Sequence, residues 1–267
     1  MKRENMHNLK ITIVQTYLEW EDIDLNLERF DTIVNTMTGD TDLIVLPEMF
    51  TTGFTMNAEK FAETMDGKAV SWMKKKSMEK KTDIAGSMII KENKKFFNRL
   101  IWAKPSEELF FYDKRHLFRY SGEEKIFTPG SDNGSANVIV SLKGWRIRPF
   151  ICYDLRFPVW TRNYQNLYDI AVFVANWPET RSCHWKALLM ARAVENQAYV
   201  IGVNRIGQDG NGLEYSGDSS IIGPNGRIIF HKASTPCVHT QALSFNALQD
   251  HRVKFPAAMD ADNFIIT

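Results

Sequence analysis

An uninterrupted apolar run, Ile-Ala-Val-Phe-Val-Ala at residues 170–175, constrains the fold of this chain more than any other stretch. It lacks the polar alternation of a strand that has one face in water, and it is far shorter than the roughly 20 residues of a membrane-spanning helix. The run therefore predicts a strand over residues 169–175 that is buried on both faces. Such a strand needs a covering layer on each side, which favours a layered α/β fold.

The order of periodic segments in the first third of the chain supports this class. Residues 9–15 form a short β-branched run, and apolar residues then recur at helical spacing over 25–37. A second apolar run at 43–46 ends at Pro47, and a polar-faced helical pattern follows over 69–78. This β-α-β-α order implies a parallel or mixed sheet with helices packed on it.

The rest of the chain adds antiparallel strands and one long helix. Three consecutive strands are expected at 83–90, 99–103 and 109–112, the first two separated by the charged stretch 91–95. Two hairpins are expected, around 143–145 and around Pro224-Asn225-Gly226. The clearest helix covers 182–196, with Ser182 as its N-cap, and a strand follows at 199–203. No linker or repeat divides the chain, so we expect residues 1–267 to form a single domain of at most four layers.

Composition excludes several classes of function. Lys and Arg number 33 against 32 Asp and Glu, so the net charge of +1 provides no field for nucleic acid, and we expect no nucleic-acid partner. The three cysteines are odd in number and none is spaced Cys-x-x-Cys, which argues against a disulfide framework and a zinc ribbon. The apolar run at 11–14 is too short for a secretory signal, and no run is long enough to cross a membrane. We therefore expect a cytoplasmic protein without a membrane partner.

No motif for a metal or cofactor is present. None of the six histidines forms His-x-x-x-His or a zinc-protease motif, and His116 and His184 are interpreted as structural hydrogen-bonding residues. The glycine-rich segment 207–212 lacks both the P-loop lysine and the dinucleotide-binding spacing, so a flexible turn is expected there. We expect neither a metal nor a cofactor.

Three reactive side chains each follow an apolar strand, where α/β folds place their sites. They are Glu48, Lys114 and Cys152. Taken alone, each has a plain alternative: a solvated strand end, a surface lysine and an inert core thiol. Together they solve one chemical problem, because a carboxylate can take the proton of a thiol while an ammonium group stabilises negative charge. The combination is typical of an amide-cleaving site that uses no histidine.

The motifs around these residues resemble a known family. The matching motifs are Leu-Pro-Glu at 46–48, Asp-Lys-Arg-His-Leu-Phe at 113–118, Phe-Thr-Pro-Gly at 127–130, Cys-Tyr-Asp-Leu-Arg-Phe-Pro at 152–158 and Ala-Asn-Trp-Pro at 175–178. With them the chain is similar, over nearly its whole length, to the nitrilase superfamily of carbon-nitrogen hydrolases. It resembles in particular the omega-amidase branch, which hydrolyses the side-chain amides of 2-oxoglutaramate and 2-oxosuccinamate. The resemblance implies a four-layer α-β-β-α sandwich and a homodimer or higher homo-oligomer.

The resemblance also implies roles for individual residues. Glu48 becomes the general base and Cys152 the nucleophile, while Lys114 and the backbone N–H of Tyr153 stabilise the oxyanion. A second glutamate supports the lysine and the base, and Glu123 is preferred over the adjacent Glu124. The reason is that Glu123 lies four residues before the Phe-Thr-Pro-Gly motif.

A carboxylate-bearing amide substrate needs a cationic anchor. Arg156 and Arg181 are the candidates, because each lies next to the proposed site and arginine binds a carboxylate bidentately. For Arg156, pairing with Asp154 or with a helix acid is an open alternative. Phe118, Asn176 and Trp177 are expected to shape the substrate pocket, although a Trp that follows an apolar strand, as Trp177 does, is more often a plain core residue.

Other functions remain open on the sequence. Within the same superfamily, the substrate could be an N-carbamoyl compound, a nitrile or an aliphatic amide. Outside it, the chain could be a non-catalytic binding protein on the same scaffold, or a redox protein using Cys152. The intact set of Glu48, Lys114 and Cys152 argues against the former, and the lack of a resolving Cys-x-x-Cys argues against the latter.

Overall fold

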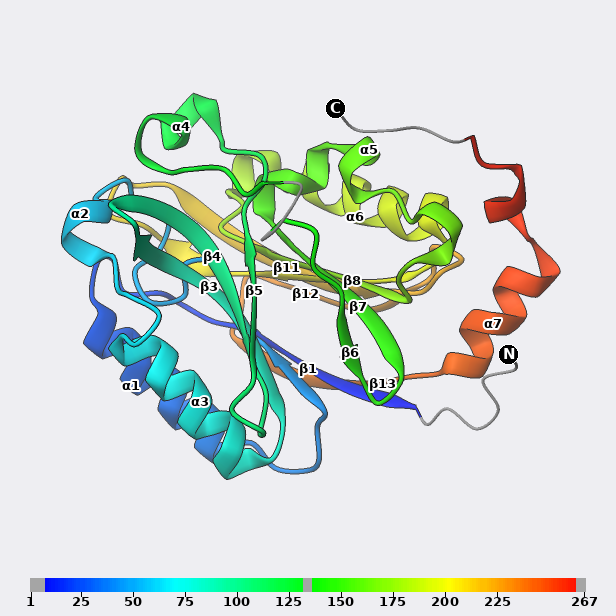
Figure 1. Ribbon diagram of the computed structural model, residues 1–267, viewed down its shortest axis with the longest axis horizontal. Helices are drawn as coiled ribbons and strands as arrows, with labels where there is room; N and C mark the ends of the chain where they lie inside the picture. The colour runs from blue at the N-terminus through cyan, green and yellow to red at the C-terminus, as the bar shows by residue number, and fades with distance from the viewer. Residues whose placement is uncertain (1–7, 132–135, 263–267) are drawn as a thin grey trace.

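Two β-sheets lie face to face between two layers of helices in the computed structural model, which describes residues 8–131 and 136–262 (Figure 1). The first sheet has the order β13-β1-β2-β3-β4-β5, and the second has the order β10-β11-β9-β8-β7-β6, with β12 added beside β11. Helices α1 and α3 cover the first sheet, and α5 and α6 lie over the second (Figure 1). This is the four-layer α-β-β-α sandwich that the sequence predicted.

The strands and helices have the following bounds. The first sheet contains β1 (Leu9–Gln15), β2 (Leu43–Val45), β3 (Asp83–Glu92), β4 (Lys95–Ala103), β5 (Leu109–Asp113) and β13 (Cys237–Leu243). The second contains β6 (Val140–Leu142), β7 (Trp145–Ile151), β8 (Ile170–Ala175), β9 (Tyr199–Asn204), β10 (Ile206–Gln208), β11 (Glu214–Ile222) and β12 (Ile228–Ala233). The helices are α1 (Ile23–Thr36), α2 (Ala58–Phe61), α3 (Lys68–Lys80), α4 (Glu123–Ile126), α5 (Pro158–Thr161), α6 (Ser182–Asn196) and α7 (Phe245–Lys254), with 3₁₀ turns η1 (Arg119–Ser121), η2 (Cys152–Arg156), η3 (Tyr164–Asn166), η4 (Glu179–Arg181) and η5 (Ala257–Asp260).

Alternating side chains assign the two faces of the first sheet. Along β2, Leu43 and Val45 pack in the core between the sheets, whereas Ile44 belongs to the core under α1 and α3. The same division separates Ile13 from Val14 on β1. Both faces are apolar because both are covered, as expected of a sheet between a helical layer and a second sheet.

The apolar run at 170–175 forms β8, which lies between β7 and β9 with parallel pairing on both sides. All its residues are buried, so the prediction of a doubly covered strand is confirmed. The outer cover is α6, which packs on β9 so closely that only glycine fits at position 202. A Cβ there would lie 2.5 Å from Leu189 Cδ1 and 2.9 Å from Trp185 Cζ2.

Helix α6 has the predicted bounds but not all of the predicted details. The N-cap is Arg181, while Ser182 is already helical and donates its hydroxyl to Asp218 Oδ2 at 2.7 Å. Within the helix, Arg192 is buried although it is charged, and Val194 is half exposed although it is apolar. Arg192 is drawn inward because its guanidinium donates twice to the carbonyl oxygen of Leu155.

The topology brings several strand ends to one edge of the molecule. Strands β1, β2 and β3 pair in parallel, as do β7, β8 and β9, and β5 runs in the direction of β3 because two antiparallel pairings separate them. Glu48, Lys114, Cys152 and Asn176 follow the carboxyl ends of β2, β5, β7 and β8, in that order.

None of the helices in residues 8–131 and 136–262 is long and apolar enough to span a membrane.

The contact at Gly202 gives a test of the packing between α6 and the second sheet. We expect Gly202→Ala to lower the free energy of unfolding by about 1–3 kcal/mol, because the core at Leu189 and Trp185 has no room for a methyl group. Thermal unfolding measures the change as a fall of several degrees in Tm. Gly223→Ala is the matched control, since its Cβ would meet nothing nearer than 3.2 Å. Equal Tm values for the two variants would contradict this packing.

Candidate active site

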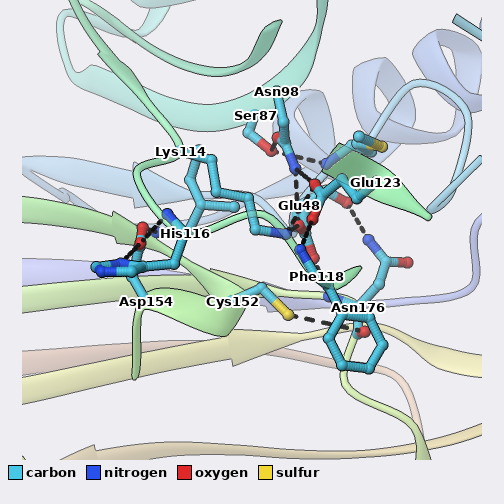
Figure 2. A network of polar contacts seen from close by, with 12 residues as sticks. Glu48, Ser87, Asn98, Lys114, His116, Phe118, Glu123, Cys152, Asp154 and Asn176 are labelled. Carbon is cyan, nitrogen blue, oxygen red and sulfur yellow. Dashed lines mark hydrogen bonds and ion pairs between the residues drawn. The ribbon is translucent and has the colours of Figure 1, made fainter. Parts of the chain in front are cut away.

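The three reactive side chains predicted from the sequence converge at the edge described above (Figure 2). Glu48 lies in the turn after β2, Lys114 directly follows β5, and Cys152 directly follows β7. Their exposed fractions are 0%, 1% and 9%. The first sheet thus contributes the carboxylate and the ammonium group, and the second contributes the thiol.

Lys114 links two buried carboxylates. Its Nζ lies 2.9 Å from Glu48 Oε1 and 2.9 Å from Glu123 Oε1. The other oxygen of Glu123 accepts the backbone N–H of Phe118 at 2.6 Å, which fixes the position of this glutamate. Glu124, the alternative candidate, makes no contact of this kind and leaves Oε2 without a partner. The structure therefore brings Glu123, and not Glu124, to the lysine.

A further residue that the sequence analysis did not identify holds the two carboxylates together. Asn98 on β4 donates its side-chain N–H groups to Glu48 Oε1 at 2.8 Å and, more weakly, to Glu123 Oε1 at 3.4 Å. The orientation of the Asn98 amide follows from Ser87, whose hydroxyl donates to its oxygen at 2.9 Å. The Ser87 hydroxyl in turn accepts the N–H of Met49, next to Glu48.

The charges of this cluster and its burial shift the pKa values of Lys114 and Glu123. Burial alone would lower the pKa of the Lys114 ammonium group, but the charges of Glu123 and Glu48 outweigh it and raise that pKa. Burial raises the pKa of Glu123, with Lys114 opposing and Glu48 reinforcing the shift. Lys114 therefore stays charged at every physiological pH.

Cys152 is held in a strained turn as an uncharged thiol. Its φ of 44° lies in the left-handed region, which is unfavourable for a side chain and is typical of functional turns. Its Sγ donates to the carbonyl oxygen of Asn176 at 3.9 Å. Burial raises the pKa of this thiol, the charge of Glu48 raises it further, and Lys114 offsets only part of the shift. The thiol consequently needs a base before it can act as a nucleophile.

Asn176 was expected to shape the pocket, and the structure places it against Glu48 as well. Its backbone N–H donates to Glu48 Oε2 at 2.7 Å, and its side-chain N–H₂ donates to the main-chain oxygen of Glu48 at 2.6 Å. The Glu48 carboxylate therefore accepts three hydrogen bonds, two at Oε1 from Asn98 and Lys114 and one at Oε2 from Asn176.

A cavity of about 750 Å³ opens beside Cys152 and reaches the surface. The residues predicted to bind substrate all line it, and they are Phe118, Arg156, Asn176, Trp177 and Arg181. Tyr153, predicted to stabilise the oxyanion, lines it as well. The guanidinium of Arg156 stacks over Trp177 at 4.8 Å, and that of Arg181 lies over Phe118 at 5.3 Å. Pairing of Arg156 with Asp154, the alternative left open by the sequence, is wrong.

Neither of these arginines has a carboxylate partner in the described part of the chain. Arg156 Nη2 instead lies 3.1 Å from His184 Nδ1. The Asp154 carboxylate accepts hydrogen bonds from Tyr112 and His116, so it has no oxygen to offer Arg156. The cavity wall therefore presents two guanidinium groups that a small anion can reach.

Another part of the cavity wall was not predicted from the sequence. The segment 207–212, expected to be a flexible turn, contributes Asp209 and Asn211, and Tyr215 donates its hydroxyl to Asp209 Oδ2 at 2.9 Å. Trp20 lies against Gly210, where a Cβ would overlap the indole ring. In the sequence, Gly210 is the residue that indicates this close contact, but its meaning becomes clear only when Trp20 is known to lie against it.

Among the described residues, no group of three or more His, Cys, Asp or Glu side chains is placed to hold a metal ion. His7 lies outside the described residues. His116 pairs with Asp154, and His184 faces Arg156, as expected of residues that hold neighbouring side chains in place.

The family model for carbon-nitrogen hydrolases matches residues 10–244, which is most of the chain and includes every residue of the site. The chain belongs to the carbon-nitrogen hydrolase family. As a member of that family it is a hydrolase.

Individual relatives are similar over nearly the whole hydrolase. The omega-amidase YafV of Escherichia coli (strain K12) is 49% identical over 260 residues, 97% of this chain and 99% of that protein. The 2-oxoglutaramate amidase of Bacillus subtilis (strain 168) is 34% identical over 208 residues, 76% of this chain and 78% of that protein. Among solved structures, XC1258 from Xanthomonas campestris, a CN-hydrolase superfamily protein with an arsenic adduct in its active site, has a TM-score of 0.94 and 41% identity, with 98% of this chain and 100% of that one covered.

The raised pKa of Cys152 predicts how its thiol titrates. We expect iodoacetamide to alkylate Cys152 slowly at neutral pH, with a rate that keeps rising above the usual thiol value of about 8.5. Mass spectrometry of the peptide that contains Cys152 gives the rate at each pH, and the exposed Cys183 serves as an internal reference in the same sample. A rate that is constant between about pH 6 and pH 9 would instead indicate a preformed thiolate paired with Lys114.

Proposed function

We propose that this hydrolase is an omega-amidase that converts 2-oxoglutaramate or 2-oxosuccinamate and water into the 2-oxo dicarboxylic acid and ammonia. One observation supports this most: a buried Glu48, Lys114 and Cys152 lie at the base of a cavity whose wall presents two guanidinium groups without carboxylate partners. The names of the relatives, omega-amidase and 2-oxoglutaramate amidase, agree with it.

In the first half of the reaction, Cys152 attacks the amide carbon. Glu48 accepts the thiol proton as the S–C bond forms, because the raised pKa leaves the resting sulfur uncharged. The oxyanion meets the Lys114 ammonium group and the N–H of Tyr153, which belongs to the first turn of η2 and has no partner within that turn. Each donor directed at such an oxygen is worth about 3–4 kcal/mol in comparable hydrolases.

In the second half, Glu48 returns its proton. The C–N bond breaks as the amide nitrogen takes the proton and leaves as ammonia, with the acyl group held on sulfur as a thioester. Glu48 then accepts a proton from water, whose oxygen attacks the thioester carbon, and the thiol is regenerated with that proton. Glu123 supports both halves, since its carboxylate keeps Lys114 charged and in place.

The substrate carboxylate is assigned to the two arginines. A guanidinium group offers two parallel N–H donors to a carboxylate, and the stacked rings of Trp177 and Phe118 limit how far Arg156 and Arg181 can turn. The omega-amide at the other end of a short dicarboxylate chain then reaches Cys152. The homodimer or higher homo-oligomer and the cytoplasmic location implied by the family resemblance stay predictions.

The proposed activity predicts a specific substrate profile. We expect rapid ammonia release from 2-oxoglutaramate and none from Cys152→Ala, because that variant lacks the nucleophile. A coupled ammonia assay compares this substrate with succinamate, glutamine, an aliphatic amide, a nitrile and an N-carbamoyl amino acid. Activity on only the aliphatic amide, the nitrile or the N-carbamoyl amino acid would support the mechanism but assign a different substrate. No activity on any of the six compounds would favour a non-catalytic binding protein.

If Arg156 and Arg181 bind the substrate carboxylate, their loss should raise the KM of a charged amide more than the KM of a neutral amide. We expect Arg156→Ala or Arg181→Ala to raise KM for 2-oxoglutaramate about 10- to 100-fold, as for the loss of a charge-assisted hydrogen bond of about 1.5–3 kcal/mol. The KM of an uncharged amide should stay within about threefold. Arg227→Ala is the control, since Arg227 is exposed on the β11–β12 turn away from the cavity. Equal increases for both substrates would remove the arginines from substrate binding.

A further inference from the structure

The carboxylate of Asp154 is fully buried and accepts four hydrogen bonds, although the proposed reaction does not use it. Oδ1 accepts the backbone N–H of His116 at 3.0 Å and its ring Nδ1 at 2.8 Å. Oδ2 accepts the hydroxyl of Tyr112 at 2.7 Å and the backbone N–H of Ile151 at 3.1 Å. Because the carboxylate can only accept, Nδ1 of His116 has to carry the ring proton.

These hydrogen bonds join the two chain segments that hold Lys114 and Cys152. Tyr112 and His116 flank Lys114 at the end of β5, and Ile151 and Asp154 flank Cys152 at the end of β7. The segments belong to different sheets, so no backbone ladder holds them together. Figure 2 shows the His116–Asp154 pair beside Lys114 and Cys152, on the side away from the Glu48 carboxylate.

We propose that Asp154 and His116 form a positioning pair that sets the distance between the Lys114 ammonium group and the Cys152 thiol. The proposal rests on the function proposed above, in which both groups act on the same amide. Neither His116 nor Asp154 lines the cavity beside Cys152. They act on geometry alone, through the short backbone connections 114–116 and 152–154.

Two features of the site require the positioning pair of Asp154 and His116, which acts as a clamp between the two segments. Cys152 has a left-handed φ, and a residue in that region persists only where its surroundings hold it firmly. Asp154 restrains this backbone because its carboxylate accepts the N–H of Ile151, the residue before Cys152. The same carboxylate binds Tyr112 and His116 at the end of β5, in the other sheet. Lys114 is already restrained on its other side by Glu48 and Glu123, so release of the clamp would move the sulfur relative to a fixed ammonium group.

Other contacts show that the ring of His116 is held in one orientation. It stacks on Phe157 at a centroid distance of 3.7 Å and an interplanar angle of 8°. The hydroxyl of Tyr112, the other donor from this segment, also accepts Trp160 Nε1 at 3.1 Å. The donors to Asp154 are therefore preorganised, and loss of one of them is not repaired by rotation of another.

The first test compares two variants at position 116. His116→Ala and His116→Asn both lose the ring that stacks on Phe157, but asparagine keeps an N–H donor near the position of Nδ1. We expect His116→Ala to lower kcat about 30- to 100-fold with KM within about threefold, as for a displacement of about 1 Å in reacting groups. His116→Asn should recover kcat to within about fivefold of the wild type. Equal kcat values for the two variants would overturn the proposal.

A second pair of variants separates positioning from stability. Asp154→Asn places an N–H₂ group against two donors, and we expect it to lower kcat at least 30-fold at temperatures where it is folded. Asp169→Asn is the matched control, because Asp169 is also a fully buried carboxylate and binds Arg146 and Arg252 at the opposite end of β8. Asp169→Asn should lower Tm and leave kcat unchanged. A kcat for Asp154→Asn no lower than that of Asp169→Asn would also overturn the proposal.

The rate of Cys152 alkylation gives a readout that does not depend on the substrate. We expect the alkylation rate of Cys152 in His116→Ala to depend on pH differently from the rate in the wild type and in His116→Asn. The reason is that the thiol of His116→Ala has moved relative to Lys114 and Glu48. If the wild type hydrolyses no amide, the proposed function fails while this comparison still tests the clamp. Identical alkylation profiles for all three proteins, with an active wild type, would reject the clamp and leave the function intact.

Discussion

The site depends on one electrostatic arrangement, a lysine ammonium group buried between two carboxylates. Each of these charges alone would be strongly destabilised away from water, and a single buried pair gains little over an apolar core. The arrangement persists because Asn98, Asn176 and the N–H of Phe118 satisfy the remaining carboxylate oxygens. Burial raises the pKa of the nearby Cys152 thiol, and the charge of Glu48 raises it further, so the sulfur rests uncharged beside the cluster.

The sequence alone predicts the strand ends of this site because local patterns determine them. An apolar run followed by a polar residue marks the carboxyl end of a buried strand, and parallel strands bring such ends to one edge. Strand ends of this kind predict Glu48, Lys114 and Cys152, whereas the preference for Glu123 over Glu124 follows from the family resemblance. The layered fold follows from the same apolar runs, most clearly from β8.

Contacts that depend on register between distant strands were not predictable. Asn98 lies 50 residues from Glu48 and sits within β4, where a single polar residue looks like any other strand residue. Its role follows only when β3 and β4 are paired, which places Ser87 beside its amide. The burial of Arg192 is not predictable for a similar reason, since the carbonyl group of Leu155 that accepts its hydrogen bonds belongs to a different segment. β13 and α7 lack strong local periodicity and were not expected.

The division of the site between the two sheets has a consequence for how the protein gains its chemistry during folding. Glu48, Lys114 and Glu123 come before residue 124, and Cys152, Asn176 and both cavity arginines come after residue 151. Neither half of the chain contains a partial catalyst that could act early. The reactive groups come together only once the two sheets have docked face to face, so the site forms together with the core between the sheets.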